Sequence, residues 1–137
     1  MKPPPMHPAV RGYLEAALFS SFAWWAPTGD VYLQKYAPLD SMYSVSDFTA
    51  AAVAKRAQVV HAFTQAYQAE IDRLGLDPDE IGRNLFWSRE RHGSGFWDAR
   101  NRWKQADPAQ ATEDMEALHA AAVALGSDTL GPEDFRS

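Results

Sequence analysis

The chain has 137 residues, of which 46% are hydrophobic and 12% aromatic, so it can bury the core of one compact domain. Its net charge of −5 argues against a protein that coats nucleic acid with its whole surface, and the absence of cysteine excludes disulfides, thiolate metal sites and a cysteine nucleophile. No apolar run approaches the ~18 residues of a membrane span, and the N-terminus lacks the apolar block of a signal peptide. We therefore expect a cytoplasmic protein that does not enter a membrane.

The N-terminal region divides into a leader and a helix. Prolines at positions 3, 4, 5 and 8 predict a flexible, extended leader over residues 1–7. Apolar residues at helical spacing, among them Val10, Leu14 and Leu18, predict a first helix from about Pro8 to Phe22.

The next segment, 26–43, has little helical periodicity. It is predicted to be a long connection that either covers the core or carries function, as loops of this length often do. Positions 31–33 are compatible with a short strand, so a minor β-hairpin from this region or from the C-terminal tail is possible.

The clearest helical pattern runs from Asp47 to Leu74, and at 1.5 Å per residue such a helix would span about 42 Å. Ser46 is a suitable N-cap because its hydroxyl can accept a hydrogen bond from the first turn. Lys55 and Arg56 interrupt the apolar face, which indicates a bend or an exposed middle turn. We expect this helix to be the central scaffold.

Two Asp-Pro pairs predict the starts of two further helices, since proline is favoured in a first helical turn. The first helix begins at Asp77 and ends near His92, and the second begins at Asp107 and ends before Gly126. Residues 127–137 are predicted to form an irregular acidic tail. The predicted fold is therefore mainly α: a single compact domain over 8–126, with about four helices packed on the long central one.

The charge is distributed unevenly along the chain. Positions 83–104 hold six basic and two acidic residues, a net +4, so the rest of the chain carries −9. Five of the 17 aromatic residues, including Trp103, fall in the same window. A basic, aromatic-rich segment in an acidic protein is a candidate anion-binding surface. Alternatively, these arginines pair with residues 107–137, which carry −6.

Within this window, segment 88–98 has the most specific combination of side chains. Its candidate binding residues are Arg89, Arg91, His92, Gly93, Gly95, Trp97 and Asp98. Arginine forks onto carboxylate or phosphate, histidine exchanges protons near neutral pH, and tryptophan offers a flat stacking face. The glycines would allow a tight turn with exposed N–H groups, and the aspartate would orient the histidine or an arginine. The alternative is structural: a glycine helix cap, aromatic core anchors and a histidine bonded to the backbone.

No complete catalytic or metal motif accompanies this segment. Gly93-Ser94-Gly95 lacks the wider Gly-x-Ser-x-Gly spacing of a hydrolase and the third glycine of a dinucleotide site. Glu116 and His119 have a spacing seen in helical di-metal sites, but no second such pair exists. We therefore expect no cofactor and no metal. A small enzyme that uses His92, Asp98 and an arginine on a phosphorylated substrate is a third hypothesis.

Three blocks of the sequence resemble a family of small acidic proteins encoded by bacteriophages and other mobile elements. The blocks are Tyr-Leu-Glu-Ala-Ala-Leu-Phe-Ser-Ser at 13–21, positions 38–44, and positions 81–98, where Arg89 precedes His-Gly-x-Gly-Phe-Trp-Asp. The resemblance implies a phage or plasmid context and brings no established activity.

The leading hypothesis is a non-enzymatic interaction protein, an accessory or anti-defence factor in the host cytoplasm. It would dock a host or viral protein through the basic-aromatic window 83–104. The alternative is a protein that binds nucleic acid or a nucleotide through the same window, by stacking and phosphate contacts. The oligomeric state is left open.

Overall fold

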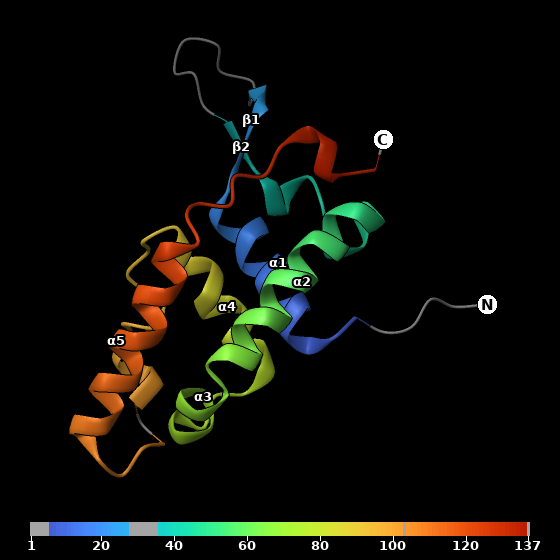
Figure 1. Ribbon diagram of the computed structural model, residues 1–137. Helices are drawn as coiled ribbons and strands as arrows, with labels where there is room; N and C mark the ends of the chain where they lie inside the picture. The colour runs from blue at the N-terminus through green and yellow to red at the C-terminus, as the bar shows by residue number, and fades with distance from the viewer. Residues whose placement is uncertain (1–5, 28–35, 103, 137) are drawn as a thin grey trace.

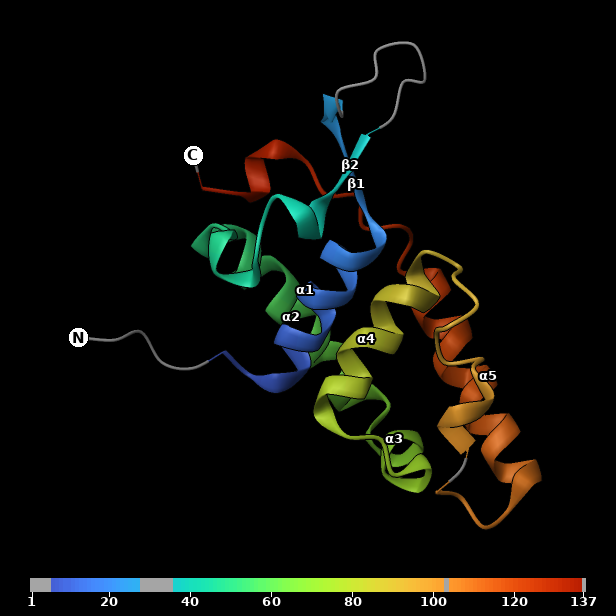
Figure 2. The same cartoon turned by 180° about the vertical axis from the view of Figure 1, so that it is seen from behind.

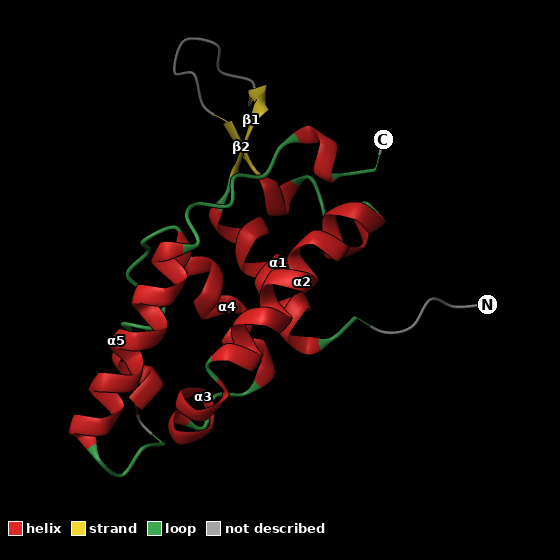
Figure 3. Cartoon of the chain, viewed as in Figure 1, coloured by secondary structure: helices red, strands yellow, loops and turns green. Residues whose placement is uncertain are grey.

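Helices make up most of the structure, a computed structural model that describes residues 6–27, 36–102 and 104–136 (Figure 3). Within these ranges the α-helices are α1 (Pro8–Ser20), α2 (Ala50–Ala66), α3 (Gln68–Leu74), α4 (Pro78–Arg89) and α5 (Pro108–Ala124). Two short strands, β1 (Phe22–Pro27) and β2 (Tyr36–Pro38), pair with each other. The mainly-α fold class is confirmed.

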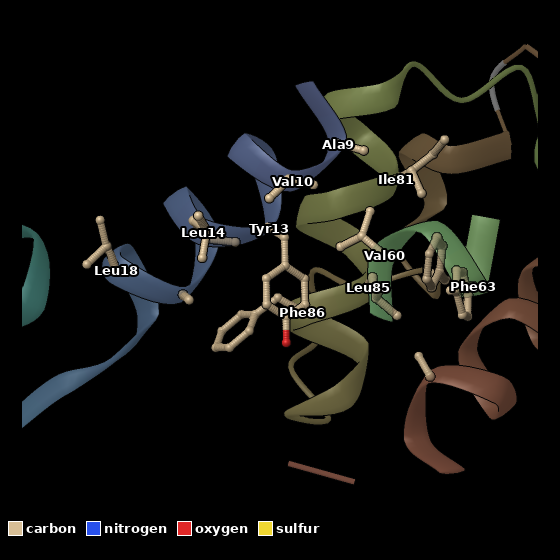
Figure 4. Close-up of a cluster of buried hydrophobic side chains, with 14 of the residues drawn as sticks. Ala9, Val10, Tyr13, Leu14, Leu18, Val60, Phe63, Ile81, Leu85 and Phe86 are labelled. Atoms are coloured by element: carbon tan, nitrogen blue, oxygen red, sulfur yellow. The ribbon is translucent and has the colours of Figure 1, made fainter. Parts of the chain in front are cut away.

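Helices α1 and α4 lie side by side in both views and form the centre of the molecule (Figures 1 and 2). Two glycines let their backbones touch. A Cβ at Gly82 would overlap the carbonyl oxygen of Ala9, and one at Gly12 would overlap the carbonyl oxygen of Asp79. This close crossing buries the main apolar cluster, which includes Val10, Tyr13, Leu14, Val60, Ile81, Leu85 and Phe86 (Figure 4).

The two strands form a small arm that projects from the end of α1 (Figures 1 and 2). α1 ends at Ser20 rather than Phe22, because Ser21 is extended with φ −111° and ψ 155°. Phe22 then pairs with Pro38, and Ala23 with Ala37, in an antiparallel register. The strand considered at 31–33 and the leader residues 1–5 lie outside the described part of the chain.

The helix predicted to begin at Asp47 begins three residues later. Thr49 caps α2 by accepting a hydrogen bond from the Ala52 amide at 3.0 Å. Ser46 and Asp47 belong instead to a separate 3₁₀ turn, Val45–Asp47, closed by reciprocal hydrogen bonds between Ser44 and Asp47. The predicted N-cap Ser46 is therefore wrong.

The single helix predicted over 47–74 is also wrong, because the chain bends at Tyr67 with φ −119° and ψ 26°. The bend turns α3 towards α5. There the Arg73 guanidinium forks onto Asp114 with distances of 3.0 and 2.8 Å, and Leu74 is buried. The periodicity of the apolar residues continues through the bend, which is why the sequence indicates one helix.

The segment after Gly126 is irregular apart from the 3₁₀ turn Pro132–Asp134, but it packs closely on the helices. Phe135 stacks on Tyr43 at 3.9 Å between ring centroids and lies 4.7 Å from the Phe48 ring. Leu130 is also buried. The predicted irregular tail therefore covers part of the core.

The C-terminal segment is held to α2 by a buried arginine. Arg56 is only 2% exposed, which corrects the predicted exposed turn at this position, while Lys55 is exposed. Its guanidinium donates to both oxygens of Asp128 at 3.2 and 2.9 Å and to Asp134 at 2.6 Å. A buried cation requires such partners, because the desolvation penalty of an unpaired charge is several kcal/mol.

The same carboxylate connects α2 to α1 and α4. The Tyr13 hydroxyl donates to Asp128 at 2.5 Å and accepts from Arg89 at 2.8 Å. Burial and then the Asp128 charge raise the pKa of Tyr13, so its hydroxyl stays protonated and donates. Glu90, next to Arg89, accepts from the Asp128 amide at 2.7 Å. We call Tyr13, Arg56, Arg89, Asp128 and Asp134 the buried polar network.

In the described part of the chain, no helix combines the length and apolar composition needed to cross a membrane.

The buried polar network predicts a specific acid sensitivity. Burial alone would raise the pKa of Asp128, but hydrogen bonds from Arg56 and Tyr13, with the Arg56 and Arg89 charges, hold it below its usual value. The ionised carboxylate therefore stabilises the fold at neutral pH. This contribution is lost as the pH falls through the unfolded-state pKa of about 3.9 and then the folded one.

Asp128→Asn should lower the free energy of unfolding at pH 7 by about 3 kcal/mol, because Arg56 loses a buried carboxylate partner. It should also flatten the decline in stability below pH 5. Urea unfolding between pH 3 and pH 7 measures both effects, with exposed Asp40→Asn as the control. Equal pH profiles for the two variants would contradict this assignment.

Candidate functional site

The chain reverses direction directly after α4, and this turn carries the predicted site. The His92 amide donates to the Trp87 carbonyl at 2.7 Å, and the Gly95 amide donates to the His92 carbonyl at 3.2 Å. Arg91, with φ 58°, is the residue in the left-handed region. Neither Gly93 nor Gly95 has a positive φ. The segment makes a tight turn, but an arginine adopts the conformation that favours glycine.

Gly95 lies so close to α4 that there is no room for a side chain at this position. Its position against α4 would place a Cβ 2.8 Å from the Ser88 amide nitrogen. The loop is fixed there because the Phe96 amide donates to Ser88 Oγ at 2.8 Å and Asn101 donates to the Gly95 carbonyl at 3.0 Å. A Cβ at Gly93, in contrast, would meet open space. Gly95 therefore positions the loop on α4, and it does not line the groove that Gly93 lines.

Arg89 points into the protein rather than towards a ligand. Its side chain is 11% exposed, and it donates to the Gly126 carbonyl and the Tyr13 hydroxyl, both at 2.8 Å. It also lies 3.8 Å from Asp128. The predicted binding role of Arg89 is therefore corrected: it belongs to the buried polar network, where it anchors the end of α5.

Asp98 is also engaged within the protein. Its carboxylate takes two hydrogen bonds from Arg100, at 2.7 and 3.1 Å, and these bonds lower the pKa of Asp98. It lines a cavity with Glu80 and Trp87, whereas His92 lines a groove on another part of the surface. Of the two predicted partners of Asp98, a histidine or an arginine, the structure shows an arginine, Arg100, and not His92. The three residues considered for catalysis do not share a site, because His92, Asp98 and Arg89 each line a different cavity.

The basic residues of window 83–104 are largely neutralised within the fold. Arg83 bonds Asp79 at 2.7 Å, Arg100 bonds Asp98, and Lys104 lies 3.5 Å from Asp77 and 3.7 Å from Glu80. Trp103 and the side chain of Arg102 lie outside the described part of the chain. Of the window's basic residues whose side chains the structure describes, Arg91 is the one with no hydrogen bond and no ion pair to another described residue.

Arg91 borders an open groove between the turn after α4 and the outer side of α5. The groove encloses about 510 Å³ and is lined by Arg91, His92, Gly93, Trp97, His119, Ala120 and Val123. Trp97 is 46% exposed, and its ring centroid is 5.5 Å from that of His119. The structure therefore brings together four of the seven predicted residues: Arg91, His92, Gly93 and Trp97. We call this surface the Arg91–Trp97 groove.

The sequence analysis considered His119 only as a metal ligand with Glu116, whereas the structure places it in this groove. Its Nδ1 lies 3.1 Å from the hydroxyl of buried Ser88 on α4. Burial and then the positive charge of Arg91 lower the pKa of His119, so the ring is neutral at pH 7. The sequence carried one signal: positions 119 and 123 share a helix face beside the core positions Leu118 and Ala122.

The second histidine of the groove is oriented by its own turn. His92 Nδ1 accepts a hydrogen bond from the Ser94 amide at 3.1 Å, and the ring stacks over Trp87 at 6.0 Å. When neutral, His92 therefore carries its proton on Nε2. The groove thus offers one unpaired cation, a flat aromatic face and two imidazole rings. Within the described residues, no cluster of three or more His, Asp or Glu is arranged to hold a metal ion.

No family model, no curated protein and no solved structure matches this chain. The relation to mobile-element proteins therefore stays a prediction from the three sequence blocks.

The two loop glycines provide a matched test of the site. Gly95→Ala forces a Cβ against the Ser88 backbone and should lower the free energy of unfolding by about 1–3 kcal/mol, as overpacking does. Gly93→Ala should change it by less than ~0.5 kcal/mol, because the position is open. Urea unfolding compares the two. Equal losses for both variants would show that the loop does not pack on Ser88 as described.

Proposed function

We propose that this protein is a non-enzymatic interaction protein that docks a partner protein through the Arg91–Trp97 groove. The observation that carries the proposal is the pairing of charges within window 83–104. Among the window's basic residues with described side chains, Arg91 alone has no described partner, so the described surface offers one free cation beside an exposed tryptophan. Tryptophan and arginine are the residues most enriched among the energetic centres of protein interfaces.

The same pairing weakens the case for nucleic acid. Proteins that follow a nucleic-acid backbone use a groove with several uncommitted Lys or Arg side chains, and each phosphate contact needs one. Here Arg83, Arg100 and Lys104 are all close to carboxylates of the same chain. An acidic segment of a protein partner needs only one or two cations, and an apolar side chain beside it would cover Trp97.

The biological setting remains part of this proposal. The resemblance of segment 81–98 to mobile-element proteins supports a host or viral protein as partner, met in the host cytoplasm. An accessory or anti-defence role would follow from such a partner. Nucleic acid or a nucleotide in the groove is kept as the competing outcome of the test.

Site-specific photocrosslinking tests the docking surface. A photoreactive amino acid at Val123, inside the groove, should crosslink one partner in a lysate of the host, whereas the same group at exposed Ala51 on α2 should not. The double variant Arg91→Ala, Trp97→Ala should abolish the crosslink. Loss of such central contacts weakens an interface by more than about 2 kcal/mol, or roughly 30-fold.

The matched control is Arg100→Ala, which removes an exposed arginine that is already paired. It should leave the Val123 crosslink intact. In parallel, a fluorescent single-stranded oligonucleotide should show no binding at 50 mM salt. Oligonucleotide binding that weakens steeply with salt and needs Arg91 and Trp97 would replace the proposed function by the competing one.

A further inference from the structure

We propose that the Arg91–Trp97 groove receives a carboxylate-bearing segment of its partner, and that docking this segment draws a proton onto His119. This inference rests on the proposed function and deepens it by naming the chemistry of the partner and the regulation of the site. It is carried by the arrangement of three groups: a free guanidinium, an exposed indole, and an imidazole bonded to a buried serine.

The first step is charge complementarity. Arg91 and His119 line the same groove, one from the turn after α4 and the other from α5. A carboxylate that forks onto Arg91 would satisfy the one guanidinium of this surface that has no partner among the described residues. The ring of Trp97, 5.5 Å from the His119 ring, would cover the adjacent apolar part of the segment.

The second step is the hydrogen bond behind His119. The Phe96 amide donates to Ser88 Oγ, so one lone pair of this oxygen is occupied. His119 Nδ1 lies 3.1 Å from Ser88 Oγ. When neutral His119 carries its proton on Nε2, the Ser88 hydroxyl donates to Nδ1; after protonation, Nδ1–H donates to the remaining lone pair of the same oxygen, and the hydroxyl hydrogen turns away from the ring. Ser88 Oγ can therefore remain the partner of Nδ1 in both protonation states.

The third step is the effect of the ligand on the imidazole. Without a ligand, burial and the positive charge of Arg91 lower the pKa of His119. A carboxylate paired with Arg91 offsets that positive charge, so the pKa of His119 rises on docking. By linkage, affinity is constant at high pH and increases as the pH falls through the pKa of the bound form. It levels off again below the pKa of the free form.

Within the described part of the chain, few titratable or polar groups face His119. The α4 side contributes Ser88, the turn contributes Arg91, His92 and Trp97, and exposed Glu116 precedes His119 by one turn on α5. His92 is the second titratable group of the groove and provides the matched control. It bonds the Ser94 amide rather than a buried partner, so its replacement leaves the Ser88–His119 bond in place.

The probe is a peptide of sequence Glu-Asp-Tyr-Glu-Asp blocked at both ends, titrated at constant ionic strength from pH 8 to pH 5.5. Binding should become tighter as the pH falls to 5.5, and a rise of one unit in the pKa of His119 limits this gain to about tenfold. His119→Gln should remove the pH dependence, His92→Gln should keep it, and Arg91→Gln should weaken binding at every pH.

An NMR titration of the His119 ring in the unaltered protein gives a second readout that needs no variant. Its midpoint should move to higher pH when the peptide is added. Binding that is independent of pH, a dependence that follows His92, or no peptide binding at all would each overturn the inference. A single-stranded oligonucleotide that binds where the peptide does not would do the same. If a partner crosslinks at Val123, the proposed function still holds when the peptide results fail. It does not hold when the oligonucleotide binds in place of the peptide.

Discussion

The structure depends on how one buried guanidinium is satisfied. Arg56 lies inside the protein at 2% exposure and takes its partners, Asp128 and Asp134, from a segment more than 70 residues further along the chain. Through Asp128 the same network reaches Tyr13 on α1 and Arg89 on α4. An unpaired charge at this depth would be strongly unfavourable, so the C-terminal segment has to remain docked for α1, α2 and α4 to keep their arrangement.

This network also determines where the groove is. Arg89 is fixed by carbonyls at the end of α5, and Glu90 by the amide of Asp128, so the last turn of α4 has a defined position and direction. The turn begins at the next residue, Arg91, whose left-handed conformation sends its side chain away from the network. Ser88 Oγ accepts a hydrogen bond from the Phe96 amide of the loop and contacts His119 Nδ1 on α5, so it connects the loop to α5. Arg89 and Arg91, two positions apart, therefore have different roles: Arg89 stabilises the fold, and Arg91 lines the groove.

Local signals in the sequence were sufficient where local chemistry decides the structure. The Asp-Pro pairs placed the starts of α4 and α5, because a proline opens both helices and Asp107 caps α5 with its own side chain. Local signals were insufficient where contacts with residues far away in the sequence determine the structure. Nothing near Arg56 shows that Asp128 will pair with it, and nothing near Tyr67 shows that α3 must turn towards Asp114. The site followed the same rule: the sequence located the turn, but it could not separate inward Arg89 from outward Arg91.

The central claim is that the groove, rather than another exposed apolar part of the surface, is where the partner docks. Phe19 at 72% exposure and Phe22 at 59% form the main rival. Amide hydrogen exchange of the protein with and without its crosslinked partner distinguishes the two most directly. The account predicts slower exchange in residues 91–97 and 116–123, with no change near Phe19. Protection confined to the end of α1 and to β1 would contradict it.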